Sequence, residues 1–202
     1  MIAKGTSGWA WWGVRATMKA AVVALLIFHV LAASTDAGAA SAPEKTYPAC
    51  HIENQARIAF QEVGAADTVR VTIDGVPCYK ANLVIQIIGA TGTALYTYSA
   101  PFKRHTAVDW EDPSLPQVAS ELARSIVQPE SKRTSKDLPP WQPAKQYYDQ
   151  TSESIRVPQA RYESLRREDR PLFSHPTHYE AWKVLYYDSQ RNVAATILTG
   201  GV

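Results

Sequence analysis

Two histidines and a glutamate near the carboxyl end of the chain have the spacing that most resembles a metal site. They lie in the segment HPTHYE as His175, His178 and Glu180. Imidazole nitrogens and carboxylate oxygens are ligands that Zn²⁺ accepts, so the segment predicts, as one alternative, a small zinc-dependent hydrolase. Pro176 excludes a regular helix at this point, and the chain contains no His-Glu-x-x-His motif. The simpler interpretation is a turn that leads into a strand and leaves the histidines partly exposed.

A third histidine, His105, lies close to several carboxylates in the segment HTAVDWEDP. A histidine oriented by a carboxylate is the core of general-base catalysis, but the reaction also needs a nucleophile. The Gly-x-Ser-x-Gly elbow of serine hydrolases does not occur after residue 40. Gly89 and Gly92 lack the further residues of a nucleotide-binding loop and are expected to form a turn. The chain is therefore predicted to be non-catalytic and to need no cofactor, with zinc as the alternative.

Aromatic side chains are frequent and give the best candidates for partner binding. Tyr96 and Tyr98 occupy alternate positions of a predicted strand, and tyrosines on the outward face of a strand can form a platform for peptides or sugars. A long polar connector contains Trp141, Tyr147 and Tyr148. Large aromatic rings in such a segment are expected to pack against the domain or to bind a ligand or partner. We predict that these residues contact a partner. The alternative is that they fill the core and an apolar patch under the connector.

The amino-terminal residues 1–40 have the organisation of a secretory signal. The apolar run from Ala20 to Ala33 has about fourteen residues, whereas a helix that spans a bilayer needs roughly twenty. Lys19 precedes this run, and the small residues at 37–39 predict cleavage before Ala40, with cleavage after Ala40 nearly as suitable. We expect a periplasmic or secreted protein with no stable membrane span after cleavage.

The first residues of the chain leave a choice of translation start. Met18 begins a complete signal by itself, so the initiator is predicted to be Met18. The competing interpretation is that residues 1–17 form a long basic region or an amphipathic segment that touches the membrane. Neither cysteine directly follows the apolar run, where a lipid-modified cysteine would be expected.

The formal net charge of +2 comes from the leader. Residues 41–202 contain 18 basic and 18 acidic side chains, so this part lacks the excess of Lys and Arg by which proteins bind nucleic acids. Its length is sufficient for one domain with a core and short for two. We expect a single exported domain that does not bind nucleic acid.

Cys50 and Cys78 are the only cysteines of the chain. An even number of cysteines in an exported protein favours a disulfide, and the alternative is a pair of reduced, buried thiols. The bond would join the start of the first strand to the loop before the central strand. It is expected to stabilise the sheet by roughly 3 to 4 kcal/mol in the chain-entropy model and to play no part in chemistry.

Hydrophobic and polar residues alternate over much of the region after Cys50, which predicts β-strands. In the segment DTVRVTIDG, Val69, Val71 and Ile73 should face the core. Residues 83–88 are almost uniformly apolar, which favours a central strand that is covered on both faces. The segment ALYTYSAPF follows after a short glycine-containing connection, so these two strands are predicted to form a hairpin.

One amphipathic helix is predicted between Asp112 and Pro129. Ser114 and Gln117 have the spacing of a capping box. The apolar face of this helix consists of Leu115, Val118, Ala119, Leu122 and Ile126.

The last third of the chain begins with an irregular connector at 130–158, rich in proline, charge and serine. Residues 159–170 are compatible with a helix but weakly patterned. The segments 178–188 and 193–201 are typical of an antiparallel hairpin. The predicted fold is α+β: mainly an antiparallel β-sheet with one packed amphipathic helix and a long Pro-rich connector before a C-terminal hairpin.

Together these features favour an exported, non-catalytic binding or accessory protein, such as an inhibitor or an envelope-associated module. Its partner would be a protein or glycan of the cell envelope. The alternative is the metal-dependent hydrolase built on His175, His178 and Glu180, and a purely structural role in the envelope is a third alternative.

Overall fold

A computed structural model describes residues 46–128, 133–141 and 154–201. The chain divides into two units, Met1–Pro43 and Glu44–Val202, and every described residue belongs to the second. The predicted leader at 1–40 and much of the predicted connector at 130–158 lie outside the described residues. The described fold is therefore that of the second unit.

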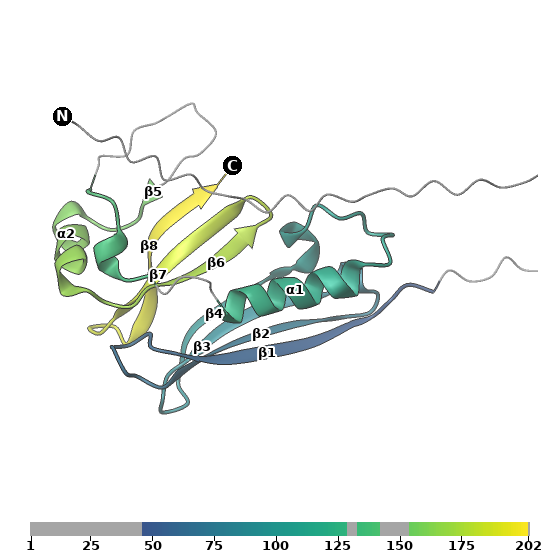
Figure 1. Ribbon diagram of the computed structural model, residues 1–202, viewed down its shortest axis with the longest axis horizontal. Helices are drawn as coiled ribbons and strands as arrows, with labels where there is room; N and C mark the ends of the chain where they lie inside the picture. The colour runs from purple at the N-terminus through teal and green to yellow at the C-terminus, as the bar shows by residue number, and fades with distance from the viewer. Residues whose placement is uncertain (1–45, 129–132, 142–153, 202) are drawn as a thin grey trace, which may run out of the picture. The chain divides into compact units, whose positions relative to one another are not determined.

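Two four-stranded antiparallel sheets and two α-helices form the described unit (Figure 1). The first sheet has the order β1-β2-β3-β4 and contains β1 (Cys50–Ile58), β2 (Asp67–Gly75), β3 (Asn82–Ile88) and β4 (Ala94–Pro101). The second has the order β5-β8-β7-β6 and contains β5 (Ser154–Ile155), β6 (Phe173–His178), β7 (Ala181–Asp188) and β8 (Val193–Gly201). The α+β class is confirmed. The sequence indicated one sheet, whereas the strands are divided between two.

The first sheet is a meander in which each strand pairs with the next along the chain. The predicted inward residues of β2, Val69, Val71 and Ile73, are fully buried, which confirms the alternation read from the sequence. The prediction that β3 is covered on both faces is wrong. Its residues alternate between fully buried and half-buried, because only one face of the sheet packs against the core. The half-buried ones are Val84, Gln86 and Ile88.

Helix α1 (Leu115–Val127) packs on β1 and β2 and closes the core of the first sheet (Figure 1). Leu115, Ala119 and Ile126 are buried, as the apolar face predicted. The expected capping box does not form, since the Ser114 side chain makes no capping hydrogen bond. Asp112 instead accepts a hydrogen bond from the Ser114 amide at 2.7 Å, which places a carboxylate just before the positive end of the helix.

A second helix, α2 (Gln159–Glu168), packs on the second sheet (Figure 1). Its inward residues, Tyr162 and Leu165, are fully buried in a separate core with Val184 and Ile197. The sequence pattern was weak here because only two positions of this short, highly charged helix are buried. In the part of the chain that the structure describes, no helix combines the length and apolar character needed to cross a bilayer.

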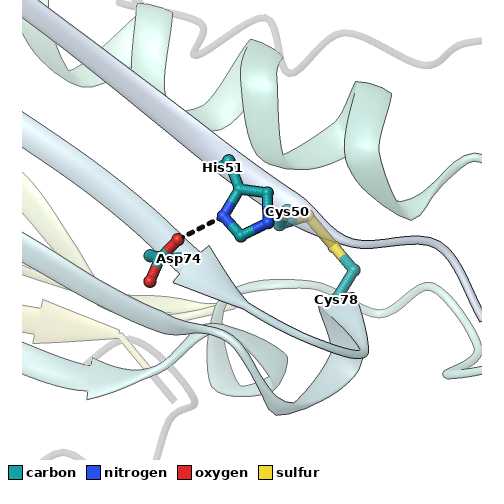
Figure 2. The surroundings of a disulfide bond; sticks show 4 residues. All are labelled: Cys50, His51, Asp74 and Cys78. Atoms are coloured by element: carbon teal, nitrogen blue, oxygen red, sulfur yellow. Dashed lines mark hydrogen bonds and ion pairs between the residues drawn. A yellow bond between two sulfur atoms is a disulfide. The ribbon is translucent and has the colours of Figure 1, made fainter.

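Three short 3-10 turns complete the described fold: η1 (Cys78–Lys80), η2 (Phe102–His105) and η3 (Ser135–Asp137). The first of these begins with Cys78, and the structure confirms the predicted disulfide between Cys50 and Cys78 (Figure 2). Their Cα atoms lie 4.7 Å apart, and the Cys78 amide donates a hydrogen bond to the Pro48 carbonyl at 2.7 Å. His51 and Asp74 pair across β1 and β2 beside the bond, on an exposed surface.

Removing the disulfide tests how much it stabilises the first sheet. Because the bond closes a loop with a sequence separation of 28, the Cys50→Ala and Cys78→Ala double variant should lose about 3 to 4 kcal/mol of unfolding free energy. Urea unfolding of the oxidised wild type and of the variant measures the difference. The wild type in reductant should match the variant. A difference below about 1 kcal/mol would contradict a stabilising role of that size.

Candidate functional site

A cluster of two tyrosines and two histidines lies where the edge strands of the two sheets meet. Tyr96 and Tyr98 come from β4, His105 from η2 and His175 from β6; we call these four residues the tyrosine–histidine cluster. Tyr96 pairs with Ile87 across the sheet, and directly opposite residues share a face. Ile87 is fully buried, so the tyrosines lie on the core face of β4 rather than on the outward face that the sequence suggested.

Hydrogen bonds connect the cluster across a large separation in sequence. The Tyr96 hydroxyl lies 2.8 Å from Nε2 of His175, a residue 79 positions further along the chain. Nδ1 of His175 lies 2.7 Å from the Pro176 carbonyl, which can only accept. Nδ1 therefore carries the ring proton, and Tyr96 donates to Nε2. Both ring nitrogens of His175 are thus occupied.

Tyr98 continues the same cluster toward η2. Its hydroxyl donates to the Thr177 carbonyl at 2.8 Å and lies 3.4 Å from Nε2 of His105. The Tyr98 ring also contacts His175, with ring centroids 5.0 Å apart. Nδ1 of His105 is buried and has no hydrogen-bond partner among the described residues. Ring contacts therefore accompany the hydrogen bonds that hold the cluster together.

Burial keeps both histidines uncharged at neutral pH. Burial lowers the pKa of His175 to about 4, and the charges of Lys183 and His105 lower it further. The hydrogen bond to the Pro176 carbonyl acts in the opposite direction and raises this pKa. Burial also lowers the pKa of His105 to about 4, with additional lowering from His178 and Arg104. An imidazole with such a pKa is a weak base near neutral pH.

The tyrosine hydroxyls are held in their neutral form as well. Burial raises the pKa of Tyr96, and the neighbouring Tyr98 raises it further. Burial also raises the pKa of Tyr98, although the charge of Arg104 opposes this. A neutral, internally hydrogen-bonded cluster is suited to joining the two sheets rather than to transferring protons. Its hydroxyls are committed to contacts inside the molecule, and partner binding by these tyrosines stays a prediction.

The three residues of the predicted zinc site are placed differently from one another. His175 is buried and uses both ring nitrogens, whereas His178 lies exposed at the end of β6 and Glu180 in the turn before β7. Across the described ranges, no group of three or more His, Cys, Asp or Glu side chains could hold a metal ion. The simpler interpretation of a turn was also incomplete, because the histidines lie in a strand that pairs with β7 despite Pro176.

The predicted aromatic residues of the connector are only partly described. Trp141 is half-buried against the core between α2 and the second sheet, and its amide donates to Glu163 at 3.0 Å. Tyr147 and Tyr148 lie outside the described residues. Their predicted role in partner binding stays a prediction.

A further aromatic group, which the sequence did not single out, includes two residues that lie close to the disulfide cysteines in sequence. Tyr47, Tyr79 and Trp110 contact one another in all three pairs, with ring centroids 5.6, 5.8 and 5.4 Å apart; we call them the aromatic platform. Trp110 is 49% exposed, and both tyrosines are half-buried. The local signal for this site was that Tyr79 directly follows Cys78 and Tyr47 lies three positions before Cys50, so the predicted disulfide brings these two residues near each other; no local pattern pointed to Trp110.

The Tyr96→Phe variant tests the joint between the sheets. Loss of the hydroxyl leaves Nε2 of His175 buried without a partner, so unfolding free energy should fall by about 1 to 3 kcal/mol. The matched control is Tyr187→Phe, which removes a hydroxyl bonded to Asn192 at an exposed site and should change stability by less than about 0.5 kcal/mol. Urea unfolding measures both. Equal effects of the two substitutions would contradict the assignment of a buried hydrogen bond.

Protonation of His175 should make folding sensitive to acid. The unfolded chain binds this proton near pH 6.5 and the folded chain only near pH 4. The stabilisation that comes from an uncharged His175 is therefore fully present above pH 6.5 and is lost as the pH falls toward 4. Between pH 7 and 4.5 the wild type should lose about 2 kcal/mol more than His175→Gln. Urea unfolding at both pH values measures this. The exposed His178→Gln control should follow the wild type, and a His175→Gln variant that does the same would contradict the prediction.

The chain was also compared with models of known protein families, with curated proteins and with solved structures. None of the three comparisons returns a match. The function is therefore inferred from the contacts, burial and charges of the described residues.

Proposed function

We propose that the chain is an exported, non-catalytic binding protein that docks a protein of the cell envelope through its aromatic platform. The observation that carries this proposal is the exposure of Trp110, 49% of whose surface remains accessible while its ring contacts both Tyr47 and Tyr79. Trp and Tyr are the residues most enriched among those that dominate binding energy at protein interfaces. Three such rings in mutual contact at the surface are therefore a candidate interface.

Two bonds constrain the segments that carry the tyrosines of the platform. The disulfide and the hydrogen bond from Cys78 to Pro48 hold the two segments that carry Tyr79 and Tyr47. Rings that are already ordered lose little conformational entropy on binding. Such preorganisation supports a surface that makes specific contacts rather than one that is exposed by accident.

A protein partner fits the surroundings of the platform better than a glycan. Val76, in the same loop as Tyr79, is 67% exposed, and the ammonium group of Lys80 lies 5.7 Å from the centroid of the Tyr79 ring. An aliphatic side chain and a cation next to aromatic rings are typical of a protein interface, in which an apolar centre is surrounded by charged groups.

The disulfide supports export, since such bonds persist in oxidising compartments and are rare in the cytosol. The leader predicted for residues 1–40 agrees with this location. In a periplasmic or secreted binding protein the disulfide and the platform would have related roles. The disulfide would stabilise the surface, and the surface would bind the partner.

Site-specific photo-crosslinking in the envelope tests this function. A photoreactive phenylalanine analogue replaces Trp110 in the full chain, and in a matched control it replaces Tyr179, which is equally exposed at 52% but lies in the turn after β6. We expect the same envelope protein to crosslink at position 110 in repeated experiments and not at position 179. The protein found is then purified, and its affinity is measured directly.

The affinity measurement decides between the possible outcomes. Trp110→Ala should weaken binding by at least about tenfold, which corresponds to roughly 1.4 kcal/mol, whereas Tyr179→Ala should leave it unchanged. Crosslinks that are the same at both positions, or an unchanged affinity of Trp110→Ala, would overturn the proposal. A crosslink from position 110 to a polysaccharide in place of a protein would show that the proposed class of partner is wrong.

A further inference from the structure

A shallow hollow of about 460 Å³ on the second sheet has a strongly positive lining. Its residues come from the segment after β5, from β7 and β8, and from the turn between them. They are Arg156, Val157, Lys183, Tyr186, Arg191, Ala195, Thr196 and Thr199. Three of these side chains are cationic and none is acidic; we call this surface the cationic hollow. Its volume lies within the range of small-molecule sites, roughly 300 to 1,000 Å³.

Among the described residues, two of the three cations have no neutralising partner nearby. Within the described ranges, neither Arg156 nor Lys183 has a carboxylate oxygen within 4.0 Å. Arg191 has a weak pairing with Asp188, at 3.8 Å, and its side chain is 79% exposed. Like charges that converge without a counterion produce a local positive potential, which attracts an anion.

The polar groups of the hollow are already placed for such a ligand. Nε of Arg156 donates to the Thr199 hydroxyl at 3.0 Å, and the Arg156 amide donates to the Ile197 carbonyl at 2.9 Å. Since the Thr199 oxygen accepts from Arg156, its own proton is available to an anion. Lys183 lies directly opposite Thr199 in the β7–β8 pair, so a second cation stands on the same face of the sheet as the Thr199 hydroxyl.

We propose that the cationic hollow binds a phosphate-type oxyanion, either free or as part of a larger molecule. Arginine presents several donors in a planar fork that matches the oxygens of phosphate, and lysine adds a compact charge. Tyr186, Val157 and Ala195 supply an apolar part of the lining, which leaves room for an organic group beside the anion. The site is formed by the second sheet and does not depend on the aromatic platform of the first.

Nuclear magnetic resonance titration of the full chain with inorganic phosphate tests the proposal. Sodium chloride at equal ionic strength is the reference. We expect saturable shifts at the amides of Arg156, Thr196 and Thr199. The double variant Arg156→Gln with Lys183→Gln should bind phosphate at least about tenfold more weakly. The control Arg124→Gln removes an exposed cation from the last turn of α1 and should leave the affinity unchanged.

A second variant protects the test against misfolding, because Lys183 also contacts the Tyr98 ring at 5.8 Å. Arg191→Gln alters only a highly exposed side chain and should weaken phosphate binding severalfold without changing the melting temperature. Saturable shifts that are scattered over the surface, or that are unaffected in both variants, would overturn the proposal.

Vesicles distinguish a lipid headgroup from a free phosphate. Sedimentation with phosphatidylglycerol vesicles is compared with sedimentation with phosphatidylcholine vesicles. Binding to phosphatidylglycerol that the double variant loses, without binding of inorganic phosphate, assigns the site to a lipid headgroup. Binding of inorganic phosphate alone assigns it to a free or soluble phosphate. If neither probe binds, the proposal is wrong.

Discussion

Two sheets that share no β-ladder in the described part of the chain must still bury a common core, and the rest of the structure depends on this constraint. The larger core extends from the first sheet and α1 to Phe173 and Leu185 of the second sheet. Where the edge strands meet, it includes the imidazole of His175, which is only 2% exposed. A polar ring is tolerated there because Tyr96 and a backbone carbonyl satisfy its nitrogens. The cluster therefore joins the edge strands of the two sheets by directional hydrogen bonds, which apolar contacts do not supply.

Features that depend on local sequence could be predicted. The faces of β2 followed from the alternation of Val69, Val71 and Ile73, because one helix covers one side of that sheet. The disulfide followed from cysteine number and the predicted compartment. Helix α1 followed from its apolar stripe, although the predicted cap by the Ser114 side chain is absent and Asp112 accepts a hydrogen bond from the Ser114 amide just before the helix.

Features that depend on tertiary contacts could not be predicted from the sequence. The register that brings Tyr96 to His175 spans 79 residues, and no local pattern encodes it. Helix α2 is stabilised by the burial of Tyr162 and Leu165 against the second sheet, so its own sequence carries little signal. The histidines of HPTHYE looked like metal ligands because the sequence shows their spacing. The sequence does not show the burial that lowers the pKa of His175.

The two proposed surfaces belong to different sheets and differ in chemistry, one aromatic and one cationic. The aromatic surface depends on the bond between Cys50 and Cys78, since Tyr79 follows Cys78 within the same 3-10 turn. Under the proposed export, the chain lacks that bond in the reducing cytosol and forms it only in an oxidising compartment. For the proposed binding protein, oxidation of the two cysteines would then couple the formation of the aromatic surface to export.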